Sequence, residues 1–247
     1  RGDGGRAELL YDHLTGAYRV AKDRWETEAL ARKLSRMTGL DEEVCREAIL
    51  AAVLFHDLGK AAEEYQRQCR TSACESFYQH YLVSALYLHA VLAKGLLTPK
   101  EANRGQLVSN VPFADNLDAG GTLARLILLP VTFHHYHQIA GLRSLEYKER
   151  QGHFEIEECA ECLRELAGFV RREFKRLRGL EVVEDLPGLL RDRGVRTAAI
   201  MFVQNLSEEI REAQKRPPEP FHLLAAIEAI TGLVNLCDGI VASRARR

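Results

Sequence analysis

The segment DEEVCREAILAAVLFHDLGK, residues 41–60, decides the fold. Asp41 is of a residue type that caps helix N-termini, acidic residues follow it in the first turn, and apolar residues then recur at helical spacing as far as Phe55. A buried helix is therefore expected to end at His56-Asp57, with Gly59 just beyond it. Because adjacent side chains on a helix point about 100° apart and glycine lets the backbone turn, this imidazole and this carboxylate can reach one ion beyond the helix end.

The helical spacing of apolar residues continues through most of the chain. Aromatic residues make up only 7% of it, and β-branched residues seldom alternate with polar ones, so the pattern does not predict strands. Residues 98–121 and 140–154 are irregular and are predicted to be loops. We predict an all-α protein in which residues 1–247 form a single helical bundle. The predicted helices span residues 25–38, 41–59, 75–95, 121–137, 155–178, 186–214 and 219–245.

Length and composition are those of a globular chain with a sizeable core: 247 residues, of which 46% are hydrophobic and 28% charged. No uninterrupted apolar run approaches the roughly 18 to 20 residues of a membrane span, so no membrane partner is expected. The six cysteines are too few and too scattered for a secreted disulfide scaffold, so we expect a cytoplasmic protein.

The charges nearly cancel. The 34 basic and 35 acidic residues give a net charge of -1, so no global field draws the molecule to nucleic acid, and such binding would need a local basic patch. One candidate is the basic run Arg171, Arg172, Lys175, Arg176 and Arg178 on a predicted helix. A run of this kind is usually a solvated face, and both interpretations stay open.

The histidines carry the chemical information, because several follow or interrupt apolar helical segments, where a titratable ring is costly to bury without a partner. Imidazole and carboxylate together suit Mn, Fe, Co, Ni or Zn, and one carboxylate can bridge two ions. Two ions about 3.5 to 4 Å apart can activate water and neutralise the charge that builds on a phosphoryl group. The candidate ligands are His13, His56, Asp57, His80, His134, His135 and Asp238.

Other motifs are weaker. His89 comes nine residues after His80 and so faces the opposite side of a helix, where surface or packing roles are expected. His137 is either near the site or in solvent, and His153 and His222 are expected to be bystanders. Cys159-x-x-Cys162 has half the spacing of a zinc site and no second pair nearby.

Taken in chain order, these motifs resemble the HD superfamily of metal-dependent phosphohydrolases, and most closely the stand-alone HD nuclease of CRISPR type I interference. The resemblance runs from His13 to Asp238 and is therefore domain-wide. Between them it rests on LFHDLGK at 54–60 with AAEEYQ at 61–66, on Phe77 and His80 with Ser84, and on Phe133-His134-His135. Tyr136 and His137 depart from the family, which often has Gly directly after the tandem histidines.

The resemblance implies an HD-domain bundle that holds one or two divalent ions, such as Mn, Fe, Co, Ni or Mg. One ion would be held by His13, His56, Asp57 and Asp238, and the other by Asp57, His80, His134 and His135. Asp57 would bridge the two ions, and Lys60 would approach the scissile phosphate, so these two are the expected catalytic residues.

The implied activity is hydrolysis of DNA, preferentially single-stranded, after a crRNA-guided surveillance complex has marked the target. The implied partner is a CRISPR-associated helicase on a separate chain, since the sequence contains no glycine-rich phosphate loop with Gly-Lys-Ser/Thr. Two alternatives stay open. One is an HD phosphohydrolase acting on nucleotides or cyclic dinucleotides, and the other is a non-catalytic binding subunit stabilised by metal.

Overall fold

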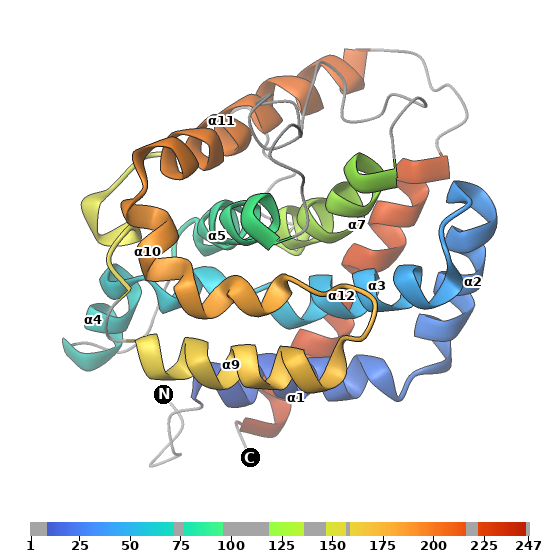
Figure 1. Ribbon diagram of the computed structural model, residues 1–247, viewed down its shortest axis with the longest axis horizontal. Coiled ribbons are helices and arrows are strands. Elements are labelled where there is room, and N and C mark those ends of the chain that lie inside the picture. The colour runs from blue at the N-terminus through green and yellow to red at the C-terminus, as the bar shows by residue number, and fades with distance from the viewer. Residues whose placement is uncertain are drawn as a thin grey trace.

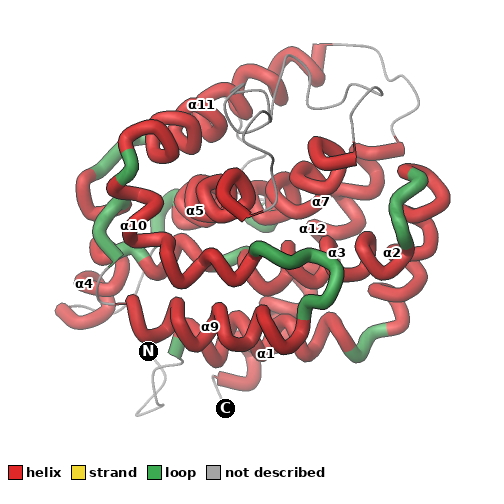
Figure 2. The backbone as a smooth tube through the Cα atoms, viewed as in Figure 1, coloured by secondary structure: helices red, strands yellow, loops and turns green. Residues whose placement is uncertain are grey.

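The computed structural model describes residues 9–71, 77–95, 119–135, 147–156, 159–215 and 222–245. Within these residues the regular structure is α-helix and short 3-10 helix without any strand, which confirms the prediction of an all-α fold (Figures 1 and 2). The α-helices are α1 (Leu10–Lys22), α2 (Trp25–Thr38), α3 (Glu42–Phe55), α4 (Glu63–Thr71), α5 (His80–Gly95), α7 (Ala119–Phe133), α9 (Ala160–Glu173), α10 (Leu186–Arg191), α11 (Arg193–Lys215) and α12 (His222–Ala245). The 3-10 helices are η1 (Leu58–Ala61), η3 (Gln151–His153) and η5 (Leu180–Asp185).

Helix α3 forms the centre of the core, where it packs against α1, α2, α7 and α12 (Figure 1). It begins as predicted, because the side chain of Asp41 accepts hydrogen bonds from the backbone N–H groups of Glu43 and Val44 at 3.0 and 3.2 Å. From Ala48 to Phe55 every residue of α3 is buried. Helix α5 is likewise buried from His80 to Leu92. Helices that are apolar on all sides belong in the core. Helix α3 ends directly before His56 and Asp57, and α5 begins at His80.

Helix α12 is strongly apolar, although Glu228 and Asp238 interrupt it, so the prediction that no uninterrupted apolar run reaches the length of a membrane span is unaffected. Its residues Ala225–Arg244 are long and apolar enough to cross a membrane by length and composition alone, the one such helix in the described part of the chain. However, 44% of that stretch is buried inside the protein, and α12 packs against α1, α2, α3 and α7. A core helix passes the same test, so this one is explained by its packing.

Several predicted boundaries were wrong for local reasons. Helix α5 begins at His80 because Gln79 has φ 62, a left-handed conformation that a right-handed helix does not continue through. The predicted helix 186–214 is two helices: Asp192 is extended, and its Oδ1 caps α11 by accepting from Gly194 and Val195 at 2.8 and 3.1 Å. Helices α1 and α4 were not predicted, and most of the two predicted loops lies outside the described residues.

A buried carboxylate joins α3 to the turn that follows α9. Glu47 is 3% exposed, and its two carboxylate oxygens accept hydrogen bonds of 2.7 to 3.1 Å from the backbone N–H groups of Lys175, Arg176 and Leu177. The predicted basic run is therefore helical only at Arg171 and Arg172, and its other members lie on this turn. Glu47 holds the turn rigidly to the core while its basic side chains face solvent.

The cysteines divide into two kinds. Cys45, Cys159, Cys162 and Cys237 are not in disulfide bonds, whereas Cys69 is disulfide-bonded. Burial raises the pKa of the Cys162 thiol to about 12. Among the described residues, neither Cys159 nor Cys162 belongs to a group with metal-site geometry.

Candidate metal centre

The end of α3 is fixed against the start of α5 by Gly59. Its backbone N–H donates to Ser84 Oγ at 2.8 Å. A Cβ at this position would lie 2.3 Å from the carbonyl oxygen of His80 and 2.5 Å from the backbone nitrogen of Ser84. Only glycine allows this approach, which brings His56 and Asp57 to the first turn of α5.

Tyr65 and Gln66, which follow His56-Asp57 in the sequence, stabilise the turn at Gly59 from its other side. Gln66 donates from Nε2 to the carbonyl oxygen of Lys60 at 2.7 Å. Tyr65 is 1% exposed and donates from its hydroxyl to the carbonyl oxygen of Tyr78 at 2.6 Å. Tyr65 and Gln66 therefore orient the backbone beside Lys60 and His80 and do not themselves enter the site.

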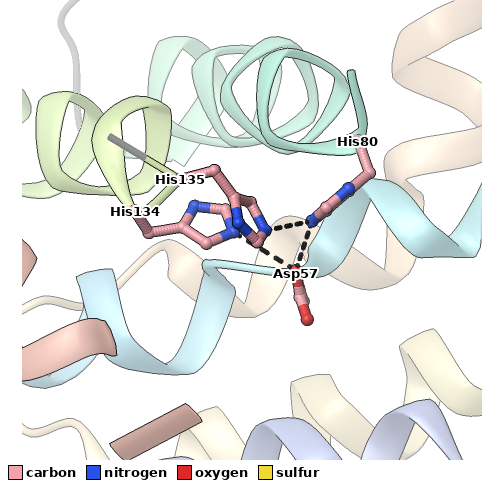
Figure 3. A group of neighbouring side chains, drawn as sticks. All are labelled: Asp57, His80, His134 and His135. Atoms are coloured by element: carbon pink, nitrogen blue, oxygen red, sulfur yellow. Dashed lines mark hydrogen bonds and ion pairs between the residues drawn. The ribbon is translucent and has the colours of Figure 1, made fainter. Parts of the chain in front are cut away.

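One cluster lies where α5 and the end of α7 meet Asp57 (Figure 3). The Oδ1 atom of Asp57 lies 3.0 Å from His80 Nε2 and 3.4 Å from His134 Nε2. The Nε2 atoms of His135 and His80 are 2.9 Å apart. One nitrogen or oxygen from each side chain lies within 4.8 Å of the others, which is a spacing that could hold a metal ion. The members of this α5–α7 cluster are Asp57, His80, His134 and His135.

A second cluster lies on the opposite side of Asp57, where α1 and α12 contribute. The Nε2 atom of His13 lies 3.2 Å from Asp57 Oδ2 and 3.2 Å from Asp238 Oδ1. The Nε2 atom of His56 lies 3.4 and 3.7 Å from the same two oxygens. The members of this α1–α12 cluster are His13, His56, Asp57 and Asp238. Asp57 turns one carboxylate oxygen to each cluster.

Three of the imidazoles are oriented in the same way. His56, His80 and His134 each place Nδ1 beside the carbonyl oxygen three residues earlier, at 2.8 Å from Val53, 2.5 Å from Phe77 and 2.6 Å from Val131. A carbonyl can only accept, so Nδ1 carries a proton, and Nε2 is the ring nitrogen that faces the site. Metal-binding histidines are commonly oriented through their other ring nitrogen in this manner.

Electrostatics separates the two clusters. Burial would lower the pKa of His13, but hydrogen bonds with Asp238 and Asp57 outweigh it and raise the pKa to about 10. In the α5–α7 cluster, burial dominates and lowers the pKa of His134 to about 4, and burial with the neighbouring His134 and His80 lowers that of His135 to about 3. Burial would raise the pKa of Asp57, but His56, Lys60 and His80 hold it well below its usual value. His134 and His135 thus present neutral imidazoles beside an ionised carboxylate.

Lys60 adds a cation next to both clusters. Its Nζ contacts Asp57 Oδ2 and lies 5.1 Å from the centre of the Phe77 ring. Its side chain is 24% exposed, so the ammonium group sits between the buried carboxylate and solvent. A phosphate that reaches the clusters from solvent would meet this ammonium group.

The donor set fits divalent ions. The Nε2 atoms of His56 and His134 and the Oδ1 atom of Asp57 are buried with no hydrogen-bond partner in the described part of the chain, although a buried polar group without a partner is costly. Nitrogen and carboxylate ligands in this ratio suit borderline transition metals rather than calcium. All seven side chains singled out in the sequence as candidate ligands are brought together around Asp57.

The remaining histidines lie elsewhere or fall outside the described residues. His89 is 4% exposed and stacks on Phe202 with ring centres 4.9 Å apart, so it packs in the core and is not at the surface. The expectation that His153 is a bystander missed its structural role: it is 2% exposed, and Tyr147 lies 3.1 Å from its Nδ1. His137 lies outside the described residues, as does the side chain of His222.

Comparison with known protein families gives a match that covers nearly the whole chain. A family model described as Cas3, HD domain, matches residues 1–246. No curated protein matches the sequence.

Proposed function

The chain belongs to the Cas3 HD-domain family of CRISPR-associated, metal-dependent nucleases, and from that premise we propose that its substrate is DNA, preferentially single-stranded. We further propose that a helicase on a separate chain supplies the unwound strand after a crRNA-guided surveillance complex has marked the target, and that the protein acts in the cytoplasm. The proposed hydrolysis is supported by the position of Asp57, because its two carboxylate oxygens face two different clusters of imidazoles.

We assign the α1–α12 cluster to one divalent ion and the α5–α7 cluster to a second. Asp57 is the side chain common to both. Bound there, the ions would supply an activated water and positive charge for phosphodiester hydrolysis. Asp238 is only partly buried, with 29% of its side chain accessible, so the α1–α12 cluster is open to solvent on the α12 side.

The protein contributes orientation and charge. His56, His80 and His134 are held by backbone carbonyls, so their Nε2 atoms point into the site without reorganisation. Lys60 is the group placed to meet a phosphate, because it is partly exposed and its ammonium has movable donors. In the reaction it would exchange part of its interaction with Asp57 for a hydrogen bond to a non-bridging phosphate oxygen, and stabilise the charge that grows there.

A cleavage assay tests this proposal. Protein stripped of metal and reloaded with Mn is incubated with labelled single-stranded DNA, the matching duplex, and a panel of nucleotides and cyclic dinucleotides. We expect cleavage of the single strand, slower cleavage of the duplex and no turnover of the nucleotides. Turnover of nucleotides alone would make the protein an HD phosphohydrolase of another kind. If the protein binds DNA but hydrolyses none of these substrates with Mn, Fe, Co, Ni or Mg, a non-catalytic subunit would be favoured.

A further inference from the structure

The outer face of α2 carries exposed cations beside an exposed tryptophan. Trp25 is 74% exposed, the highest value among the large hydrophobic residues of the described part of the chain. Residues 25, 29, 32 and 36 follow the spacing that places side chains along one stripe of a helix. Arg32, Lys33 and Arg36 are all exposed. A shallow groove of about 480 Å³ runs along this face and is lined by Ala29, Arg32, Lys33, Arg36 and Met37.

The positive charge of this face is not neutralised by nearby acids. Within the described residues, none of its three cations forms an ion pair, whereas the acidic residues of α2 are engaged elsewhere. Glu28 pairs with Arg46 of α3 at 2.5 Å, and Glu26 pairs with Arg24 at 2.5 Å. In a chain with a net charge of -1, such a local excess is what attracts a polyanion.

The face lies apart from the metal centre. The ion pair of Glu28 with Arg46 fixes α2 beside the first half of α3, whereas His56 and Asp57 follow the end of that helix. Arg46 and Asp57 are separated by eleven residues, or about 16 Å of helix rise. A ligand on α2 would therefore hold the substrate at a distance from the reacting phosphate and would not take part in the chemistry.

We propose that the outer face of α2 binds the backbone of single-stranded DNA that flanks the cleaved bond, with Arg32, Lys33 and Arg36 on phosphates and Trp25 stacked on a base. This inference rests on the proposed DNA substrate. Cations that follow a backbone, combined with an aromatic platform, are the usual means of binding single strands without sequence preference. Trp, Met and Arg are also enriched in protein–protein interfaces, so what favours a polyanion here is the excess of three cations that form no ion pair within the described residues.

The test measures binding separately from cleavage. The 247-residue protein in EDTA is titrated with a fluorescent single-stranded oligonucleotide at several salt concentrations. The variants are Trp25→Ala and the pair Arg32→Gln/Arg36→Gln, and the matched control is Arg193→Gln, an exposed cation on α11. We expect Trp25→Ala to weaken binding by roughly 5- to 150-fold. The double variant should reduce the slope of log K against log salt by about 0.7 for each phosphate that the protein no longer neutralises.

Hydrolysis of a small phosphodiester, bis(p-nitrophenyl) phosphate, by the Mn-loaded variants should equal that of the wild type, since neither substitution touches the metal centre. Suppose that the wild type binds the oligonucleotide and that both variants bind it with the same affinity and the same salt slope. That result would overturn the α2 proposal and leave the DNA substrate assignment standing. A wild type that does not bind single-stranded DNA would overturn the α2 proposal together with the substrate assignment. If the variants bind DNA like the wild type but no longer form a complex with the helicase, α2 is a protein-binding surface, and this result would also overturn the proposal.

Discussion

The Nε2 atoms of His80 and His135 lie 2.9 Å apart, and the Nδ1 atom of His80 lies 2.5 Å from the carbonyl oxygen of Phe77. Because Nδ1 of His80 lies beside that carbonyl, its Nε2 is the ring nitrogen that faces His135. Two nitrogens at this distance share either a proton, which a neutral His135 can donate from Nε2, or a bound cation. Burial with the neighbouring His134 and His80 lowers the pKa of His135 to about 3, so this ring stays neutral and can give a lone pair to a cation.

We predict that His135→Ala removes one ion and His13→Ala removes the other, because each residue belongs to a single cluster. Elemental analysis after dialysis against Mn should give two equivalents for the wild type and one for each variant. Asp57→Ala should bind neither ion firmly and lose hydrolysis, while circular dichroism reports an unchanged helix content. Equal ion content in all four proteins would contradict the assignment of two clusters that share Asp57.

Gly59→Ala should disrupt the site through packing. The added Cβ would lie 2.3 Å from the carbonyl oxygen of His80, so α5 must move away from the HD pair. Overpacking of this kind costs about 1 to 3 kcal/mol of unfolding free energy. Stability in chemical denaturation and Mn affinity should both decrease. The control is Gly232→Ala in α12, where nothing lies within 4 Å and the helix should be stabilised by up to about 1 kcal/mol. Retention of wild-type Mn affinity by Gly59→Ala would contradict this role.

The apolar periodicity was sufficient to predict the helical class, and the resemblance carried by the ordered motifs was sufficient to assign the ligands of both clusters. Burial of an imidazole alone was not, because His89 is buried in α5 and only packs on Phe202. The sequence did not predict the break at Gln79 or the function of Ser84, since both depend on how α5 meets the turn at Gly59. Helix α4 was missed because its residues are mostly polar, which weakens the apolar periodicity.

Glu47 was also missed, although a signal was present. A carboxylate within the apolar run of α3 requires a partner, but the partners are backbone groups 128 to 130 residues later, and no local pattern identifies them. The same limit applies to α2, where the sequence shows basic residues but not which acids are already paired.

Glu47→Ala should be strongly destabilising. The substitution leaves the backbone N–H groups of Lys175, Arg176 and Leu177 without their acceptor, and the N–H of Leu177 is in a buried position. Each unsatisfied buried donor costs about 1 to 3 kcal/mol, so we expect a total loss of about 3 to 5 kcal/mol in urea denaturation. Glu43→Ala on the same helix is the control, since Glu43 is exposed and a surface substitution changes stability by about 0.5 kcal/mol or less. A loss below about 1 kcal/mol for Glu47→Ala would show that the turn does not depend on the carboxylate.

His89 should make stability depend on pH. Burial lowers its pKa to about 4 from an ordinary value of 6.5, and its Nδ1 has no hydrogen-bond partner among the described residues. The unfolded chain therefore binds a proton at His89 at a higher pH than the folded chain does. Stability is at its full value above pH 6.5 and decreases as the pH falls from 6.5 to about 4, by about 3 kcal/mol in total.

His89→Leu keeps an apolar contact with Phe202 and removes the titrating ring. Unfolding free energies of both proteins, measured between pH 7 and pH 4.5 with Mn present, should diverge in favour of the variant as the pH falls. The metal clusters titrate equally in the two proteins, so the difference between the curves isolates His89. Parallel curves over this range would mean that His89 is protonated equally in the folded and unfolded chains, which its burial against Phe202 does not allow.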